Sequence, residues 1–191
     1  MTGLFSELID YMEEEDWKYE ILEGETIIRF HFKGTAGRLL CYGEVDEEKY
    51  WLIFYSYMPV NVPPEKMIDA AEFVARANRG MRIGNFELDY DDGEMRYKTS
   101  LDVEGGELSG KMIDNLLRAN LSTINRYFTG LMELIYSDRL VIDLIKKIEA
   151  PPGEFEALDA ETSESDDEDE EETPFVPDEE ADEEDERKPR F

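Results

Sequence analysis

The chain has 191 residues and a formal net charge of −29 at pH 7. Residues 151–191 contain 20 of the 49 acidic residues and three of the 20 basic residues, so this segment carries −17 and the remainder carries −12. Both parts repel the phosphates of nucleic acids and anionic lipids, whose binding depends on Lys and Arg. We therefore expect neither a nucleic-acid partner nor a membrane partner.

Apolar residues are concentrated before residue 150, where both Trp, the single His, the single Cys and all the Tyr lie. The acidic end has too little apolar surface to offset the entropy lost on ordering. We predict one domain over residues 1–149 and a disordered acidic tail over residues 150–191. With Cys41 as the only cysteine there is no internal disulfide, which favours a cytoplasmic location.

The first 60 residues predict a helix followed by an antiparallel meander. Apolar residues from Leu4 to Met12 recur at helical spacing, and Thr2 can cap that helix. Four strand-like runs follow with short connections between them. They cover residues 17–22, 26–33, 38–45 and 50–60.

The fourth run is apolar on both sides, which predicts a central strand. We expect a helix, another protomer or a ligand to cover its aromatic side. The two sides are Leu52, Phe54 and Met58 on one, and Trp51, Ile53, Tyr55 and Tyr57 on the other.

After the meander, Pro63-Pro64 predicts a helix over residues 64–79, and apolar residues around its circumference predict deep burial. A hairpin follows, with its turn at Asp92-Gly93. Ser109 can cap a long helical region that reaches Glu149, and we expect a break near Ser137. The order α-ββββ-α-ββ-α-α predicts an α+β fold with an antiparallel sheet packed with helices.

No motif predicts catalysis, so we expect a protein that is not an enzyme and has no catalytic residue, cofactor or metal site. The stretch from Gly105 to Met112 resembles a phosphate-binding loop, but Met112 stands where a hydroxyl would hold magnesium. The carboxylates around Asp92 lack the spacing of a calcium-binding loop. His31 and Cys41 should point to opposite sides of the sheet, which separates a thiol from its base.

Two charged features remain open between a binding role and a neutral one. The cations Arg29, His31, Lys33 and Arg38 surround one hairpin turn and could receive an anionic segment, including the chain's own tail; the alternative is a solvated face. In the tail, Phe175 and Val176 lie between acidic blocks. This pattern is typical of a short linear motif, although it can also be incidental.

The residues from Ala75 to Ser109, ARANRGMRIGNFELDYDDGEMRYKTSLDVEGGELS, resemble the YbjN domain family together with the order of elements. Members are described as bacterial sensory transduction regulators, and their fold is similar to that of type III secretion chaperones. The resemblance implies a type III secretion chaperone-like fold and a homodimer that offers apolar surface to a client protein.

We therefore predict a non-enzymatic protein-binding module acting as a chaperone, adaptor or signalling regulator. The alternative is a small-molecule sensor with a pocket between the sheet and the helix over residues 64–79. Two apolar stripes are the candidate partner-binding residues, unless both are plain core. They are Trp51, Ile53, Tyr55 and Tyr57 on the fourth strand, and Leu117, Leu121, Ile124 and Phe128 on the long helix.

Overall fold

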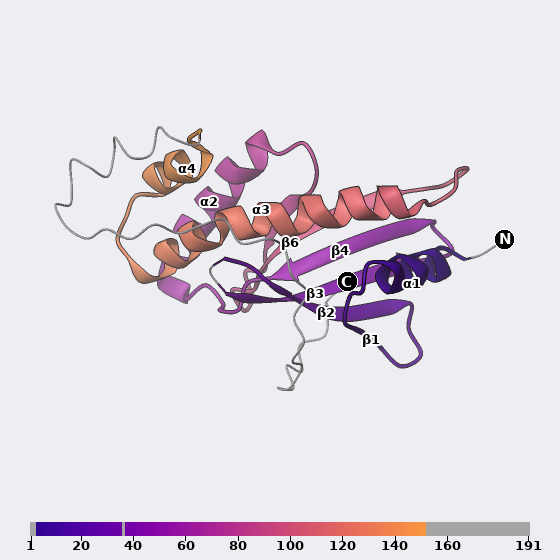
Figure 1. The fold of residues 1–191 in the computed structure, drawn as a ribbon. Helices are drawn as coiled ribbons and strands as arrows, with labels where there is room; N and C mark the ends of the chain where they lie inside the picture. Colours follow the sequence, from indigo (N-terminus) through magenta and orange to yellow (C-terminus); the bar gives the residue numbers. More distant parts are fainter. Residues whose placement is uncertain (1–2, 36, 152–191) are drawn as a thin grey trace.

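A six-stranded antiparallel sheet is the centre of the molecule, in a computed structural model that describes residues 3–35 and 37–151 (Figure 1). The strand order is β1-β2-β3-β4-β6-β5. The strands are β1 (Tyr19–Ile21), β2 (Ile27–Lys33), β3 (Arg38–Asp46), β4 (Trp51–Tyr57), β5 (Asn85–Leu88) and β6 (Met95–Asp102). The helices are α1 (Leu4–Glu14), α2 (Met67–Gly80), α3 (Gly110–Tyr136) and α4 (Val141–Glu149), with a short 3-10 turn, η1 (Pro64–Lys66), before α2.

The predicted α+β class and element order are confirmed, and β4 lies inside the sheet as its two apolar sides indicated. The predicted break in the long helix is also confirmed, because α3 ends at Tyr136 and α4 begins at Val141. Ser109 caps α3 by accepting a hydrogen bond from the amide of Met112. At the predicted hairpin turn, Gly93 adopts a φ of +77°, which glycine tolerates without steric cost.

The helices of the described chain pack on one face of the sheet, with α3 running across the central strands (Figure 1). The main core lies between these two layers. Phe30, Leu39, Phe54 and Tyr97 from four strands meet Ile124 and its neighbours from α3 there. We call the opposite side of the sheet the open face.

The first helix is capped from a distance rather than by a neighbouring side chain. Gly3 is the N-cap and provides no side-chain acceptor. The carboxylate of Glu47, in the turn between β3 and β4, instead accepts the amides of Leu4 at 3.1 Å and Phe5 at 2.8 Å. Thr2, the cap expected from the sequence, lies outside the described residues.

Deep burial of α2 was a wrong prediction. Only Ala70, Phe73 and Ala77 are buried in this helix, and they recur along a single stripe. Ile68 is 81% exposed. Helix α2 packs against the edge strand β5 and against α4, so its remaining circumference faces solvent.

A buried amide fixes α3 over the two central strands. Asn120 is fully buried, and its side-chain nitrogen donates to the carbonyl oxygens of Phe54 at 3.1 Å and Tyr97 at 3.3 Å and to the hydroxyl of Thr99 at 3.2 Å. Its side-chain oxygen accepts from the hydroxyl of Ser56 at 2.6 Å. One side chain thus joins α3 to both β4 and β6.

Replacing Asn120 with Ala should lower the free energy of unfolding by about 2 kcal/mol, because the buried Ser56 and Thr99 hydroxyls lose a hydrogen-bond partner. Urea unfolding would show a lower midpoint with an unchanged slope. Ser122→Ala, at an exposed position of the same helix, is the control and should change stability by less than about 0.5 kcal/mol. Equal midpoints for the two variants would contradict the role given to Asn120.

Candidate functional site

The open face is built from residues that stand opposite one another across the strands. One row reads Arg29–Tyr42–Tyr55–Lys98 and the next reads His31–Leu40–Tyr57–Arg96, each running through β2, β3, β4 and β6. We call these the tyrosine rows. Each has an apolar centre and a basic side chain at both ends.

The centre of the tyrosine rows forms a second apolar cluster, separate from the main core. Its buried members are Ile27, Leu40, Tyr42, Tyr55 and Tyr57. The rings of Tyr42 and Tyr57 meet edge to face with centroids 5.7 Å apart, a favoured aromatic geometry. Tyr42 and Tyr57 are each 1% exposed. A solvated sheet face does not bury tyrosine to this degree, so this face is not a wetted surface of the usual antiparallel kind.

Arg96 connects the apolar centre to the charged edge. Its guanidinium lies 4.4 Å from the ring centroid of Tyr55, within the range of a cation–π interaction. It also donates to the hydroxyl of Tyr57 at 3.0 Å and to the carboxylate of Glu87 at 2.8 Å. Burial raises the pKa of Tyr57 to about 12, although Arg96 opposes this shift, so the phenol stays protonated at neutral pH.

Glu87, on the edge strand β5, balances two of these cations. It accepts hydrogen bonds from both Arg96 and Lys98. Partial burial alone would raise its pKa, but these two hydrogen-bonded cations outweigh burial and hold the pKa of Glu87 below its ordinary value. The carboxylate therefore stays ionised and orients both basic side chains.

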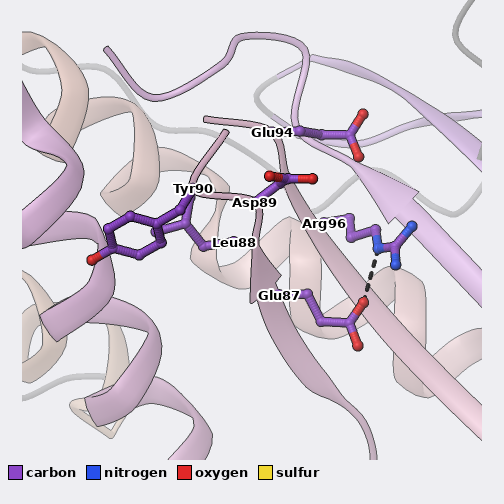
Figure 2. A pocket seen from close by; sticks show the side chains of 6 residues that line it. All are labelled: Glu87, Leu88, Asp89, Tyr90, Glu94 and Arg96. Atoms are coloured by element: carbon purple, nitrogen blue, oxygen red, sulfur yellow. Dashed lines mark hydrogen bonds and ion pairs between the residues drawn. The ribbon is translucent and has the colours of Figure 1, made fainter. Parts of the chain in front are cut away.

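A hollow lies at the β5–β6 hairpin, beside this ion pair. Figure 2 shows the Arg96 and Glu87 side chains joined, while Asp89 and Glu94 lie toward the hairpin turn and the Tyr90 ring points away from the ion pair. The volume of the hollow is about 320 Å³. Asp89 and Asp92 also accept the amides of Asp91 and Glu94, so these carboxylates shape the turn.

A second hollow, of about 470 Å³, lies at the other end of the open face. Trp51, Ile53 and Tyr55 give it an apolar floor, and Trp51 is 40% exposed. Its charged rim is mainly acidic and has two lysines. The rim residues are Glu44, Asp46, Asp102, Lys49 and Lys98.

The structure separates the two stripes proposed for partner binding. Trp51, Ile53, Tyr55 and Tyr57 share the open face. The α3 stripe belongs to the main core instead, since the sheet covers it, and it is not an accessible surface in this fold. Its members are Leu117 at 1%, Leu121 at 2%, Ile124 at 0% and Phe128 at 6% exposure.

Other candidate residues have structural roles or lie elsewhere. Cys41 is buried in the main core beside Ser56, and burial raises the pKa of its thiol to about 12. His31 stands opposite Leu40 on the open face, so the predicted separation of His31 from Cys41 is confirmed. The amine of Lys111 donates to Asp114. Phe175 and Val176 of the tail motif lie outside the described residues.

The pocket expected between the sheet and residues 64–79 stays a prediction. Ala70, Phe73 and Ala77 of α2 are fully buried on the sheet side. The two hollows described above lie instead at the β5–β6 hairpin and on the open face. No group of three or more His, Cys, Asp or Glu side chains able to hold a metal occurs in residues 3–35 and 37–151. In the same residues, no helix is long and apolar enough to cross a membrane.

Sequence patterns missed part of the site. Leu40 and Tyr42 come from β3, and Arg96 and Lys98 come from β6, and none of these was a candidate partner-binding residue. Side chains alternate along β3, so with Leu39 and Cys41 in the main core, Leu40 and Tyr42 lie on the other face. That signal was present, but only the register across β4 and β6 joins these residues to Tyr55 and Tyr57.

Comparison with known proteins assigns the fold. An antiparallel six-stranded sheet with the described helices on one face defines an α+β domain. The YbjN family model, described as "Putative bacterial sensory transduction regulator", matches residues 5–133, and the chain belongs to this family.

Solved structures with similar folds have little sequence identity to this chain. YbjN from E. coli is 11% identical with a TM-score of 0.50, covering 65% of this chain and 86% of its own. The HopA1-SchA chaperone-effector complex contributes a chain that is 17% identical with a TM-score of 0.48, covering 65% and 93%. A chain of the ExsC-ExsE complex is 13% identical with a TM-score of 0.49, covering 66% of this chain and 97% of its own. No curated protein has a significant match to the chain.

Lowering the pH should remove the contribution that the ionised Glu87 side chain makes to the free energy of unfolding. Its pKa is lowered in the folded state, so this stabilisation is present above the unfolded value of about 4.3 and disappears as pH falls through the lower folded value. Glu87→Gln should cost up to about 1 kcal/mol at pH 7, discounted for partial exposure. The difference from the unmodified chain should shrink as pH falls below about 4.3 and vanish once pH lies below the lowered folded pKa.

Urea unfolding from pH 3 to pH 7 measures this dependence. Glu72→Gln is the matched control, because Glu72 forms an exposed ion pair with Arg76 at 2.6 Å in α2. Its stability should follow that of the unmodified chain at every pH. A Glu87→Gln deficit that is constant with pH would exclude the ion-pair explanation.

Proposed function

We propose that this protein is a non-enzymatic binding module that holds a segment of a client protein on its open face, as a chaperone, adaptor or signalling regulator. One observation carries the proposal. A continuous aromatic and aliphatic cluster, bordered by the partly exposed Trp51, occupies the centre of a sheet face on which none of the described helices packs. Membership of a family described by regulation agrees with this role.

The chemistry of the open face suits a protein segment. Buried aromatic side chains and arginine contribute most of the energy in protein interfaces, and Tyr55, Tyr57 and Arg96 are in mutual contact here. Trp51 and Ile53 extend the apolar surface into an open hollow. A client with apolar residues spaced along an extended strand or helix would bury them in this region.

A photoreactive phenylalanine analogue at position 51 tests the proposal in the native cells. We expect crosslinks from this position to one or a few other proteins, because the Trp51 side chain is accessible at the rim of the apolar surface. Ile53→Asp in the same chain should reduce the yield about tenfold, since a buried carboxylate opposes association. Mass spectrometry of the products gives the readout.

The same analogue at position 83 is the control. Ile83 is 52% exposed and lies between α2 and β5, outside the apolar cluster of the open face. It should give no comparable product. Equal crosslinking from positions 51 and 83, or no effect of Ile53→Asp, would argue against client binding on this face.

The proposal includes a homodimer and a cytoplasmic location. Exposed apolar side chains near one contact between helices are the candidate surface for self-association. The amine of Lys66 donates to the carbonyl oxygen of Ser137 at 2.6 Å, so the start of α2 adjoins the turn between α3 and α4. Three exposed apolar residues lie within three positions of Lys66 or Ser137 in the sequence. They are Ile68 at 81%, Tyr136 at 70% and Leu140 at 67% exposure.

Light scattering should give twice the chain mass of 22.2 kDa for the unmodified protein and the single mass for Ile68→Asp, because a charge at the centre of an apolar interface prevents its burial. Ile21→Asp, at a 48% exposed position of β1, should remain dimeric. A monomeric unmodified chain would rule out the dimer and leave the open-face proposal intact.

A further inference from the structure

The open face lacks a second layer in the part of the chain that the structure describes. Tyr42 and Tyr57 are buried on this face, and Tyr55 is 5% exposed, yet α1, α2, α3 and α4 all pack on the other face. A tyrosine standing on a bare sheet keeps part of its ring in water. The burial of these tyrosines therefore indicates that a further segment covers the open face.

Basic side chains lie at both ends of the apolar centre, although the chain as a whole has a strongly negative net charge. Arg29 and His31 lie at one end of the tyrosine rows, and Arg96 and Lys98 lie at the other. Glu20 pairs with Arg29 at the β2 end, whereas at the β6 end the single carboxylate of Glu87 pairs with both Arg96 and Lys98. Lys33 and Arg38 continue the basic surface at the end of the β2–β3 hairpin.

The tail carries the complementary pattern. Phe175 and Val176 are adjacent, and acidic blocks lie on both sides, at residues 164–172 and 178–186. Pro174 and Pro177 enclose the apolar pair and favour an extended conformation. Apolar residues between two acidic blocks match an apolar centre between two basic ends.

The distance between the basic ends is similar to the length of the tail segment. The basic ends are three strand spacings apart, about 14 Å. Glu172 and Asp178 would be about 19 Å apart in an extended proline-containing segment. Arg and Lys side chains can bridge the difference of a few ångströms, so both ends can pair at once.

The stretch of chain between Pro151 and Phe175 is long enough to reach the open face. The described chain ends at Pro151, 24 residues before Phe175. A stretch of this length spans at most about 80 Å, and about 27 Å on average if flexible. A domain of this size is on the order of 40 Å across. A tethered segment of this reach has an effective concentration in the millimolar range, which permits occupancy by weak contacts.

We propose that residues 172–178 of the chain's own tail dock across the tyrosine rows, with Phe175 and Val176 on the apolar centre and the flanking acidic blocks at its basic ends. The rim of the Trp51 hollow has three carboxylates and two lysines, one of which is Lys98, so an acidic segment is attracted less strongly there than to the ends of the tyrosine rows. A docked tail and a client segment would compete for the same tyrosines. The tail thereby acts as a built-in inhibitor whose release exposes the face.

Paramagnetic broadening in the full chain tests the contact directly. A nitroxide attached at Ala181→Cys reports on amide signals of nearby residues. Cys41 is fully buried with a thiol pKa of about 12, so the new cysteine is labelled selectively. We expect at least a twofold loss of signal intensity at Leu40, Tyr42 and Tyr55, without a comparable loss on α3.

Two changes should restore the signals if the segment docks as proposed. Phe175→Ser combined with Val176→Ser removes the apolar anchor, and 0.5 M NaCl screens the charge pairs. Broadening that spreads evenly over the domain, or that persists in the double variant, would overturn the proposal. This readout requires no client, so its failure leaves the proposed function standing.

A mixed sample separates the chain's own tail from the tail of a second copy. Isotope-enriched chain without the spin label is combined with spin-labelled chain that is not isotope-enriched. We expect no broadening of the open face in this mixture. Broadening equal to that of the singly labelled sample would show docking between copies and would overturn docking within one chain.

Discussion

The contact of Asn120 with the sheet is the interaction on which the two-layer arrangement depends. A buried amide is costly unless its donors and acceptors are all used, and this one finds its partners only when α3 crosses β4 and β6 in one register. Apolar packing alone would tolerate small shifts of the helix along the sheet. The amide network therefore fixes the position of α3, and with it the face that the helices cover.

The position of α3 on one side of the sheet leaves the opposite side as the open face. Alternation along each strand sends one set of side chains toward α3 and the other set away. Since α1, α2 and α4 gather beside α3, the second set receives no described helix. Its residues are nonetheless aromatic and aliphatic at the centre and charged at the edges. A sheet face with that composition is suited to binding an additional segment, either from a client or from the chain itself.

Charge differs between the parts of that face. The chain as a whole is strongly acidic, yet its tyrosine rows begin and end with cations that Glu87 and Glu20 hold in place. Long-range attraction would draw acidic segments to these rows, whereas the rim near Trp51 carries carboxylates. This arrangement permits competition between an acidic tail and an apolar client.

The sequence by itself determined the α+β class, the order of elements, the break after α3 and the opposite orientation of His31 and Cys41, because periodicity, turn residues and caps are local properties. The tertiary structure was needed to place Leu117 and Phe128 in the main core and Tyr55 and Tyr57 in the cluster on the open face, since both stripes are equally apolar in the sequence. It also decided the exposure of Ile68 and the capping of α1 by Glu47. Burial and pairing between distant residues depend on which layers meet, and strand register across β3, β4 and β6 sets that.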